Sequence, residues 1–178
     1  QKGIDLIARA VKEINNIQGL NLLIVGEPVE ESMHNLLRSL SGNITTSLNF
    51  TNPYLQHLIL AGSDAMLMPS RYEPCGFVQM EGMRYGAVPV VTRVGGLKET
   101  VMPFDGNQGY GFIIDENTPD GIVKALIATR DAFRDKERWR VAVGNALREN
   151  FAWDGPRNSV GKYIALYERL MAQKEVKH

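Results

Sequence analysis

The sequence predicts an α/β fold built on a doubly wound parallel sheet with a Rossmann-like arrangement. Short apolar runs without polar alternation, such as 21–25 and 88–91, are typical of strands buried on both faces. Between these runs, apolar residues recur at helical spacing, and glycines stand where the helices end. Strands that alternate with helices favour parallel pairing, because each helix provides the crossover between neighbouring strands.

Three helices and three strands are expected in the first half of the chain. A helix over 4–17 is predicted by five apolar residues at helical spacing and by Gly19 at its end. The helix over 53–62 begins at a proline, which suits the first helical position. In order, the expected elements are a helix at 4–17, a strand at 21–25, a helix at 30–40, a weaker strand at 44–50, a helix at 53–62 and a strand at 65–68.

The second half continues the alternation and then becomes helical. Gly86 stands where the helix over 77–85 needs a left-handed cap. Thr118 and Pro119 form a helix start, with the threonine as N-cap and the proline in the first turn. The expected elements are a helix at 77–85, strands at 88–91 and 112–114, a helix opening at 118, and helices at 136–149 and 157–173.

Domain organisation follows from the absence of internal repeats and low-complexity linkers. Residues 1–178 are therefore interpreted as one domain. The sequence starts at Gln1 without an initiator methionine and runs directly into a helical pattern. We therefore expect it to be part of a longer protein.

Composition excludes several classes of partner. Lys plus Arg equals Asp plus Glu at 20 each, whereas a nucleic-acid module shows a basic stripe. No apolar run approaches the roughly 20 residues of a membrane span. The single cysteine, Cys75, excludes an internal disulfide and predicts a reducing, cytoplasmic location. The chain has no Asp-x-Asp pattern and no cluster of histidines and cysteines, so no metal site is expected.

The residues that suggest chemistry gather in two segments, 69–81 and 94–100. Both follow predicted strands, and open α/β sheets bind ligands beyond the carboxyl ends of their strands. Gly76 and Phe77 open a helix, and free amides at such a point suit an anion such as a diphosphate. Glu73 lies in the loop before that helix, and Glu81 lies about one turn into it.

The second segment contains the glycine pair Gly95 and Gly96, whose backbone can approach a phosphate or sugar closely. Each feature also has an ordinary explanation. Two carboxylates eight residues apart are more often both solvated, and a glycine pair after a strand is more often a plain turn. Cys75 is interpreted as a small buried side chain, and Arg71 as a structural brace for its loop.

Together these motifs resemble bacterial glycogen and starch synthases. The resemblance rests on residues 69–76 (PSRYEPCG), 83–91 (MRYGAVPVV) and 95–101 (GGLKETV), with support from 1–6, 61–64 and 151–153. It implies the C-terminal half of a two-lobed GT-B enzyme with its active site between the lobes. This lobe would hold ADP-glucose or UDP-glucose as donor substrate. A missing N-terminal lobe would hold the α-1,4-glucan whose non-reducing end is extended, with retention of anomeric configuration.

The resemblance also assigns roles to particular residues. Lys2 matches a lysine that contacts the diphosphate, and Glu73 matches a glutamate beside the donor glucose that orients the sugar and stabilises charge. Glu81 matches a glutamate that binds the ribose hydroxyls in related transferases. The remaining donor contacts that it implies are at Cys75, Gly76, Phe77, Gly95, Gly96 and Leu97. No metal or other cofactor is implied, because Lys2 and backbone amides supply the phosphate donors.

The sequence departs from the family pattern at two of these places. Many bacterial glycogen synthases have no acid at the position of Glu81. The family often places a tyrosine against the adenine where Thr51 stands here, and Phe50 could take its place. The helices within 136–173 are expected to pack toward the missing lobe.

Three other functions are compatible with the same residues. The first is another GT-B transferase or a sugar-nucleotide epimerase on this scaffold. The second is a glycoside hydrolase with Glu73 and Glu81 as its carboxylate pair, a reaction that needs the two groups about 5–10 Å apart. The third is a non-catalytic module that binds a sugar nucleotide.

Overall fold

The computed structural model describes residues 1–48, 52–154 and 159–175. Phe50 and Thr51, the residues expected near the base, lie outside this part of the chain. The chain separates into two compact units, Gln1–Arg148 and Glu149–His178. The sequence predicted one sugar-nucleotide-binding domain over 1–178, and that assignment stays a prediction. Each unit is described by itself.

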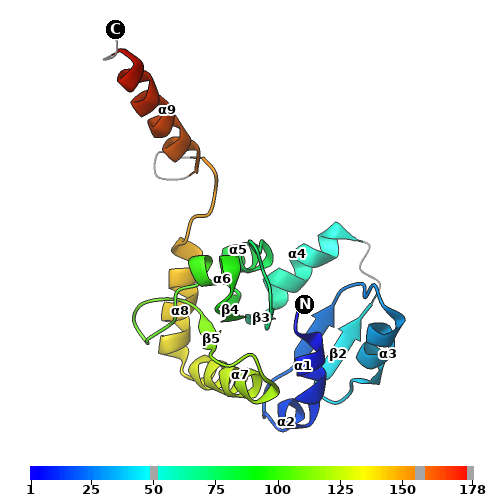
Figure 1. Ribbon diagram of the computed structural model, residues 1–178. Coiled ribbons are helices and arrows are strands. Elements are labelled where there is room, and N and C mark those ends of the chain that lie inside the picture. Colours follow the sequence, from blue (N-terminus) through cyan, green and yellow to red (C-terminus); the bar gives the residue numbers. More distant parts are fainter. Residues whose placement is uncertain (49–51, 155–158, 176–178) are drawn as a thin grey trace. The chain divides into compact units, whose positions relative to one another are not determined.

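All strands of the first unit pair in parallel (Figure 1). β1 (Leu22–Val25) pairs with β2 (Ile44–Ser47). The other sheet has the order β3 (Ala65–Met68), β4 (Val88–Thr92) and β5 (Phe112–Ile114). The predicted α/β class with parallel strands is confirmed.

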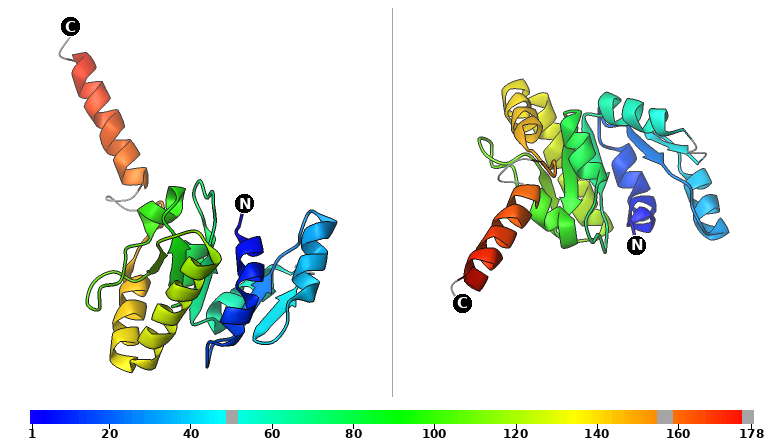
Figure 2. Two further views of the ribbon diagram at one scale, coloured as in Figure 1. Left: turned by 60° about the horizontal axis from the view of Figure 1, so that its bottom comes forward. Right: turned by 90° about the horizontal axis from the view of Figure 1, so that it is seen from above.

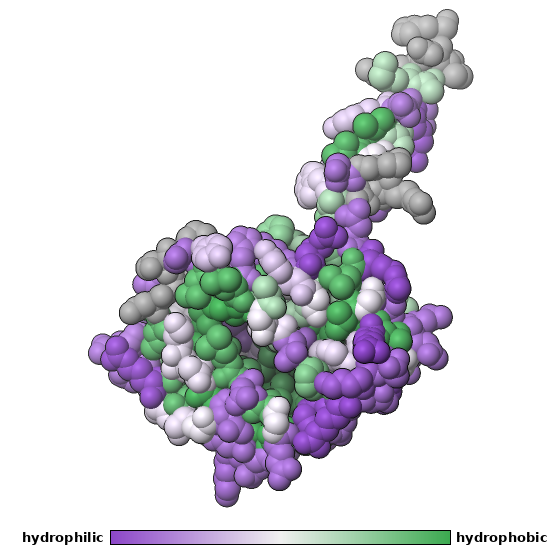
Figure 3. Space-filling view, turned by 180° about the vertical axis from the view of Figure 1, so that it is seen from behind, coloured by the Kyte–Doolittle hydropathy of each residue, from purple (hydrophilic) through white to green (hydrophobic). Residues whose placement is uncertain are grey.

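The expected single sheet is divided, because the ladders of the described residues form one two-stranded and one three-stranded sheet. An apolar run identifies a strand without naming its neighbour, so the sequence did not reveal this division. Strands β1 and β3 line a common cavity of about 850 Å³. Figure 3 shows apolar side chains gathered around a hollow on one face of the molecule.

The helices follow the predicted order with two differences. The helix expected over 4–17 is interrupted at Ala10, and the glycine pair 95–96, for which a plain turn was the ordinary alternative, begins a short helix. Their bounds are α1 (Ile4–Arg9), α2 (Val11–Asn15), α3 (Glu31–Ser39), α4 (Pro53–Gly62), α5 (Val78–Arg84), α6 (Gly95–Thr100), α7 (Pro119–Arg134), α8 (Lys136–Arg148) and α9 (Ser159–Glu175). The Thr118 cap is confirmed, because its side chain accepts a hydrogen bond from the amide of Gly121.

The core of the first unit joins the strands to the helices after them. Helices α7 and α8 lie side by side and pack against the β3–β4–β5 sheet (Figure 2). Val90, Ile114 and Ile122 are at most 2% exposed in the main apolar cluster. Trp139 of α8 stacks on Phe112 of β5, with ring centroids 6.4 Å apart. This packing fixes the carboxyl ends of β3 and β4, where the motif loops begin.

The second unit contains α9. Its exposed apolar side chains include Val160, Tyr163, Ile164, Tyr167, Leu170 and Met171. Of the helices expected to pack toward another lobe, α8 packs within the first unit against α5, α7 and β4. A packing partner for α9 stays a prediction. Within the described ranges, no helix is both long and apolar enough to cross a membrane.

Candidate functional site

The two motif loops form one continuous structure beyond the carboxyl ends of β3 and β4. The amide of Gly96 donates a hydrogen bond to the carbonyl oxygen of Glu73 at 2.9 Å. A Cβ atom at Gly95 would overlap with the Glu73 carbonyl, and one at Gly96 would overlap with the Cys75 carbonyl. Glycines are therefore needed here because the two backbones touch. The sequence also predicted a close approach at this pair, but to a phosphate or sugar.

The first residues of the chain are attached to the same loop. The amide of Arg71 donates to the carbonyl oxygen of Gln1 at 2.9 Å. Two nitrogens of the Arg71 guanidinium donate to the two carboxylate oxygens of Asp5, each at 2.7 Å. These bonds hold the pKa of Asp5 below its usual value. Arg71 therefore braces its loop against α1, in agreement with its structural interpretation.

This attachment brings together two residues that are 71 positions apart, Lys2 and Glu73. The Lys2 Nζ lies 2.6 Å from Glu73 Oε2. Glu73 is only 6% exposed, and the Ser70 hydroxyl donates to the same carboxylate oxygen at 3.2 Å. The Lys2 side chain is 58% exposed. A buried carboxylate is thus paired with a cation that remains accessible to solvent.

The backbone at Gly76 leaves two amides without a hydrogen-bond partner in the described part of the chain. Gly76 has a φ of 72°, in the left-handed region, and Phe77 follows in the right-handed α region. Among the described residues, neither the Gly76 nor the Phe77 amide donates a hydrogen bond to the protein. Left-handed and right-handed residues in succession make neighbouring amides converge, which is a typical anion-binding arrangement.

Other predicted contacts are placed differently. The Gly96 amide, expected to bind phosphate, is occupied by the Glu73 carbonyl in this structure. Leu97 is fully buried in an apolar cluster with Val91 and Val101. Cys75 is exposed, so its interpretation as a buried side chain is wrong. The chain turns at Gly76 before it re-enters the core, and this leaves Cys75 at the surface.

Glu81 lies on α5 in an environment unlike that of Glu73. Its carboxylate is exposed and accepts a hydrogen bond from Gln56 Nε2 of α4 at 2.8 Å. Gln56 was not predicted as a site residue, because a polar residue on a helix carries no signal of its own. Gln79, which is fully buried beneath the loop, was not predicted either. A polar residue at a core-facing helical position was the available signal.

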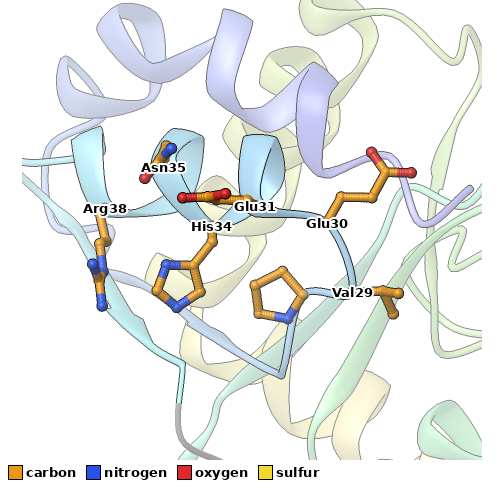
Figure 4. A pocket seen from close by; sticks show the side chains of 7 residues that line it. Val29, Glu30, Glu31, His34, Asn35 and Arg38 are labelled. Carbon is orange, nitrogen blue, oxygen red and sulfur yellow. The ribbon is translucent and has the colours of Figure 1, made fainter.

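A separate open pocket of about 420 Å³ is lined by residues 28–30, in the loop before α3, and by α3 itself (Figure 4). Its lining includes the carboxylates Glu30 and Glu31 together with His34 and Arg38. These groups carry both signs of charge. The sequence assigned them no function.

Comparison with known proteins identifies the family of this chain. The family model for glycosyl transferases group 1 matches residues 1–140. The chain belongs to this family. A glycogen synthase from Anaeromyxobacter dehalogenans is 41% identical over 174 residues, which cover 96% of this chain and 36% of that protein. A glycogen synthase from Marinobacter nauticus is 37% identical and covers 100% of this chain and 37% of its own length. The chain thus spans about a third of these transferases.

Solved structures of transferases share the fold. The catalytic domain of starch synthase IV from Arabidopsis thaliana, bound to ADP and acarbose, matches with a TM-score of 0.74 and 28% identity. The match covers 97% of this chain and 36% of that domain. Sucrose-phosphate synthase from Thermosynechococcus elongatus matches with a TM-score of 0.68 at 24% identity, which shows the fold alone. The expected GT-B fold class is confirmed.

Proposed function

We propose that this chain is the donor-binding lobe of a retaining glucosyltransferase of the glycogen and starch synthase type. The donor is ADP-glucose or UDP-glucose, and glucose is transferred to the non-reducing end of an α-1,4-glucan. The observation that carries the proposal is the Lys2–Glu73 pair beside the converging amides of Gly76 and Phe77. The similarity to glycogen synthases along nearly the whole chain supports it.

The chemistry of the donor accounts for this arrangement. Cleavage of the bond between glucose and diphosphate builds negative charge on the phosphate and positive charge on the sugar. Fixed donors at the phosphate stabilise the first charge, and Lys2 with the two amides can supply them. The Glu73 carboxylate, held in place by Ser70, orients the sugar and stabilises the second charge. In the same proposal, Glu81 binds the ribose hydroxyls.

The acceptor site belongs to a part of the protein outside these residues. The chain covers only about a third of the glycogen synthases that it matches, which leaves room for a second lobe. We expect the 178-residue chain to bind donor without elongating glucan. A cytoplasmic location is part of the proposal, and a single unpaired cysteine supports it.

Calorimetric titration of the chain with ADP-glucose and UDP-glucose side by side tests the proposal. We expect saturable binding of at least one of them, and Lys2→Met should weaken it. Lys124→Met removes an exposed lysine of α7 and serves as the matched control, with unchanged binding. The proposal fails if neither sugar nucleotide binds, or if the two variants behave alike.

A further inference from the structure

Gln79 of α5 is a buried amide that touches both motif loops. Its side chain is 0% exposed. Its Nε2 donates to the carbonyl oxygens of Gly76 at 2.7 Å and Cys75 at 3.2 Å, and it lies 3.0 Å from Thr100 Oγ1. Since carbonyl oxygens only accept, the amide nitrogen must face them, and this fixes the orientation of the side chain.

These bonds determine where the adjacent amides point. In a planar trans peptide, the carbonyl and the following N–H point in opposite directions. Gln79 holds the Cys75 and Gly76 carbonyls toward the interior, so the N–H groups of Gly76 and Phe77 are directed away from it. Neither of these N–H groups donates a hydrogen bond to the described part of the chain.

Thr100 extends the connection to the second loop. Its hydroxyl donates to the Gly96 carbonyl at 2.7 Å and is a third acceptor, beside the two carbonyls, that shares the two hydrogens of Gln79 Nε2. The Gly96 amide in turn donates to the Glu73 carbonyl. Gln79 and Thr100 therefore link α5, α6 and the loop that carries Glu73 through consecutive hydrogen bonds.

The burial of Gln79 is not explained by a gain in the stability of the fold. Its Oε1 is buried and has no hydrogen-bond partner in the described part of the chain. An unpaired buried acceptor destabilises a fold, and an apolar side chain of the same length would avoid that cost. A buried polar atom without a hydrogen-bond partner is an exception to normal packing, and such exceptions are expected at functional sites.

We propose that Gln79 is a positioning residue that aims the Gly76 and Phe77 amides at the diphosphate of the sugar nucleotide. It acts through the backbone and makes no contact with the donor. The inference rests on the proposed function, because it takes the diphosphate as the ligand of these amides. In this proposal, Gln79 and Thr100 together orient the amides that donate to the phosphates.

Replacement of Gln79 by methionine keeps the side-chain length and removes the amide. We expect the affinity of the chain for ADP or UDP, whichever the wild type binds, to fall about tenfold, the effect of weakening one hydrogen bond to a charged group. The affinity for the corresponding nucleoside should stay within about twofold, because the nucleoside has no phosphate. A purely structural role would lower the unfolding temperature and leave both affinities unchanged in the folded protein.

Thr100→Val is the second variant, and it should also weaken the nucleoside diphosphate selectively. Thr129→Val is its matched control, because Thr129 is buried and its hydroxyl donates to a carbonyl four residues earlier in α7, as that of Thr100 does. We expect the control to bind like the wild type. If Gln79→Met does not fold, Thr100→Val decides the question.

The outcomes distinguish this inference from the proposed function. A wild-type chain that binds no sugar nucleotide and no nucleoside diphosphate overturns both. Normal binding by the wild type, together with wild-type affinity in Gln79→Met and Thr100→Val, overturns the positioning role alone. An equal loss of nucleoside and nucleoside diphosphate affinity also overturns it, because the effect is then not directed at the phosphates.

Discussion

At the scale of single residues, Glu81 and Glu73 differ in environment, and their proposed roles differ with it. Glu81 is exposed and bonded to Gln56, as a group that binds ribose hydroxyls can be. Replacement of Glu81 by alanine should weaken free nucleotide and sugar nucleotide alike, by about 1.5–3 kcal/mol, the range for a hydrogen bond to a charged group. Calorimetry measures both affinities.

The matched control is Glu99→Ala, which removes another exposed carboxylate near the motif loops. Its effect should stay within about 0.5 kcal/mol, as for ordinary surface substitutions. Equal effects of the two variants would contradict a ribose contact at Glu81.

Glu73 should affect turnover rather than nucleotide affinity. Its interaction with the sugar would strengthen as positive charge develops, so Glu73→Ala should lower kcat by about 100-fold or more in the longer transferase that we propose. Nucleotide affinity should change little. Steady-state kinetics with calorimetry measure the two effects, and Glu73→Gln controls for the lost volume. Wild-type turnover in Glu73→Ala would refute the catalytic assignment.

The Asp5–Arg71 pair predicts a pH-dependent contribution to stability. Because the pKa of Asp5 is lowered in the folded chain, the pair stabilises the fold above the ordinary carboxyl pKa. This stabilisation is lost as the pH falls through the lowered value. Asp5→Asn should therefore unfold at a slightly lower temperature than the wild type at pH 7, and the difference should shrink below about pH 4.

Thermal unfolding across this pH range measures the effect. Arg71→Met removes the other partner of the pair. Its difference in unfolding temperature from the wild type should shrink at low pH in the same way. A difference between Asp5→Asn and wild type that stays constant down to pH 2 would point to another cause than the ion pair.

At the scale of elements, α6 is held against the loop after β3 by close backbone contact. A methyl group at Gly96 overlaps with the Cys75 carbonyl, so Gly96→Ala must displace α6 or the loop. We expect a loss of about 1–3 kcal/mol in the free energy of unfolding, the range for overpacking, together with weaker donor binding. Chemical denaturation and titration measure these changes.

Gly62→Ala is the matched control, because a Cβ atom there meets nothing within 4 Å. This residue ends α4 and has no positive φ, so alanine there should change the free energy of unfolding by less than about 1 kcal/mol. Equal stability of the two variants would show that the loops separate at little cost.

At the scale of the whole molecule, the proposed phosphate donors come from the protein itself. Lys2 and the amides of Gly76 and Phe77 lie on segments joined by hydrogen bonds and ion pairs. We therefore expect EDTA to leave the affinity for ADP and UDP within about twofold, because the proposed site uses no metal to bridge phosphate and protein. Loss of binding in EDTA and its recovery with Mg²⁺ would show that the proposed phosphate site is wrong.

The sequence by itself determined the α/β class, the order of strands and helices and the two loops that carry the motifs. Apolar runs, helical spacing and glycine or proline at element ends depend on neighbours along the chain, so they can be recognised without a structure. The resemblance of the motifs led to the transferase family, and the family match confirms it.

Only the tertiary structure decided which distant residues meet. Lys2 and Glu73 are 71 positions apart, and their contact depends on how α1 packs beside the β3 loop. The contacts of Gln79 and the division into two sheets likewise arise between segments that no local pattern relates. The Gly95–Gly96 pair could be recognised as a place of close approach, but its partner is the backbone of 73–75. The spacing of residues along the chain indicates the secondary structure of one segment. The contacts between distant residues depend on how the segments pack against each other.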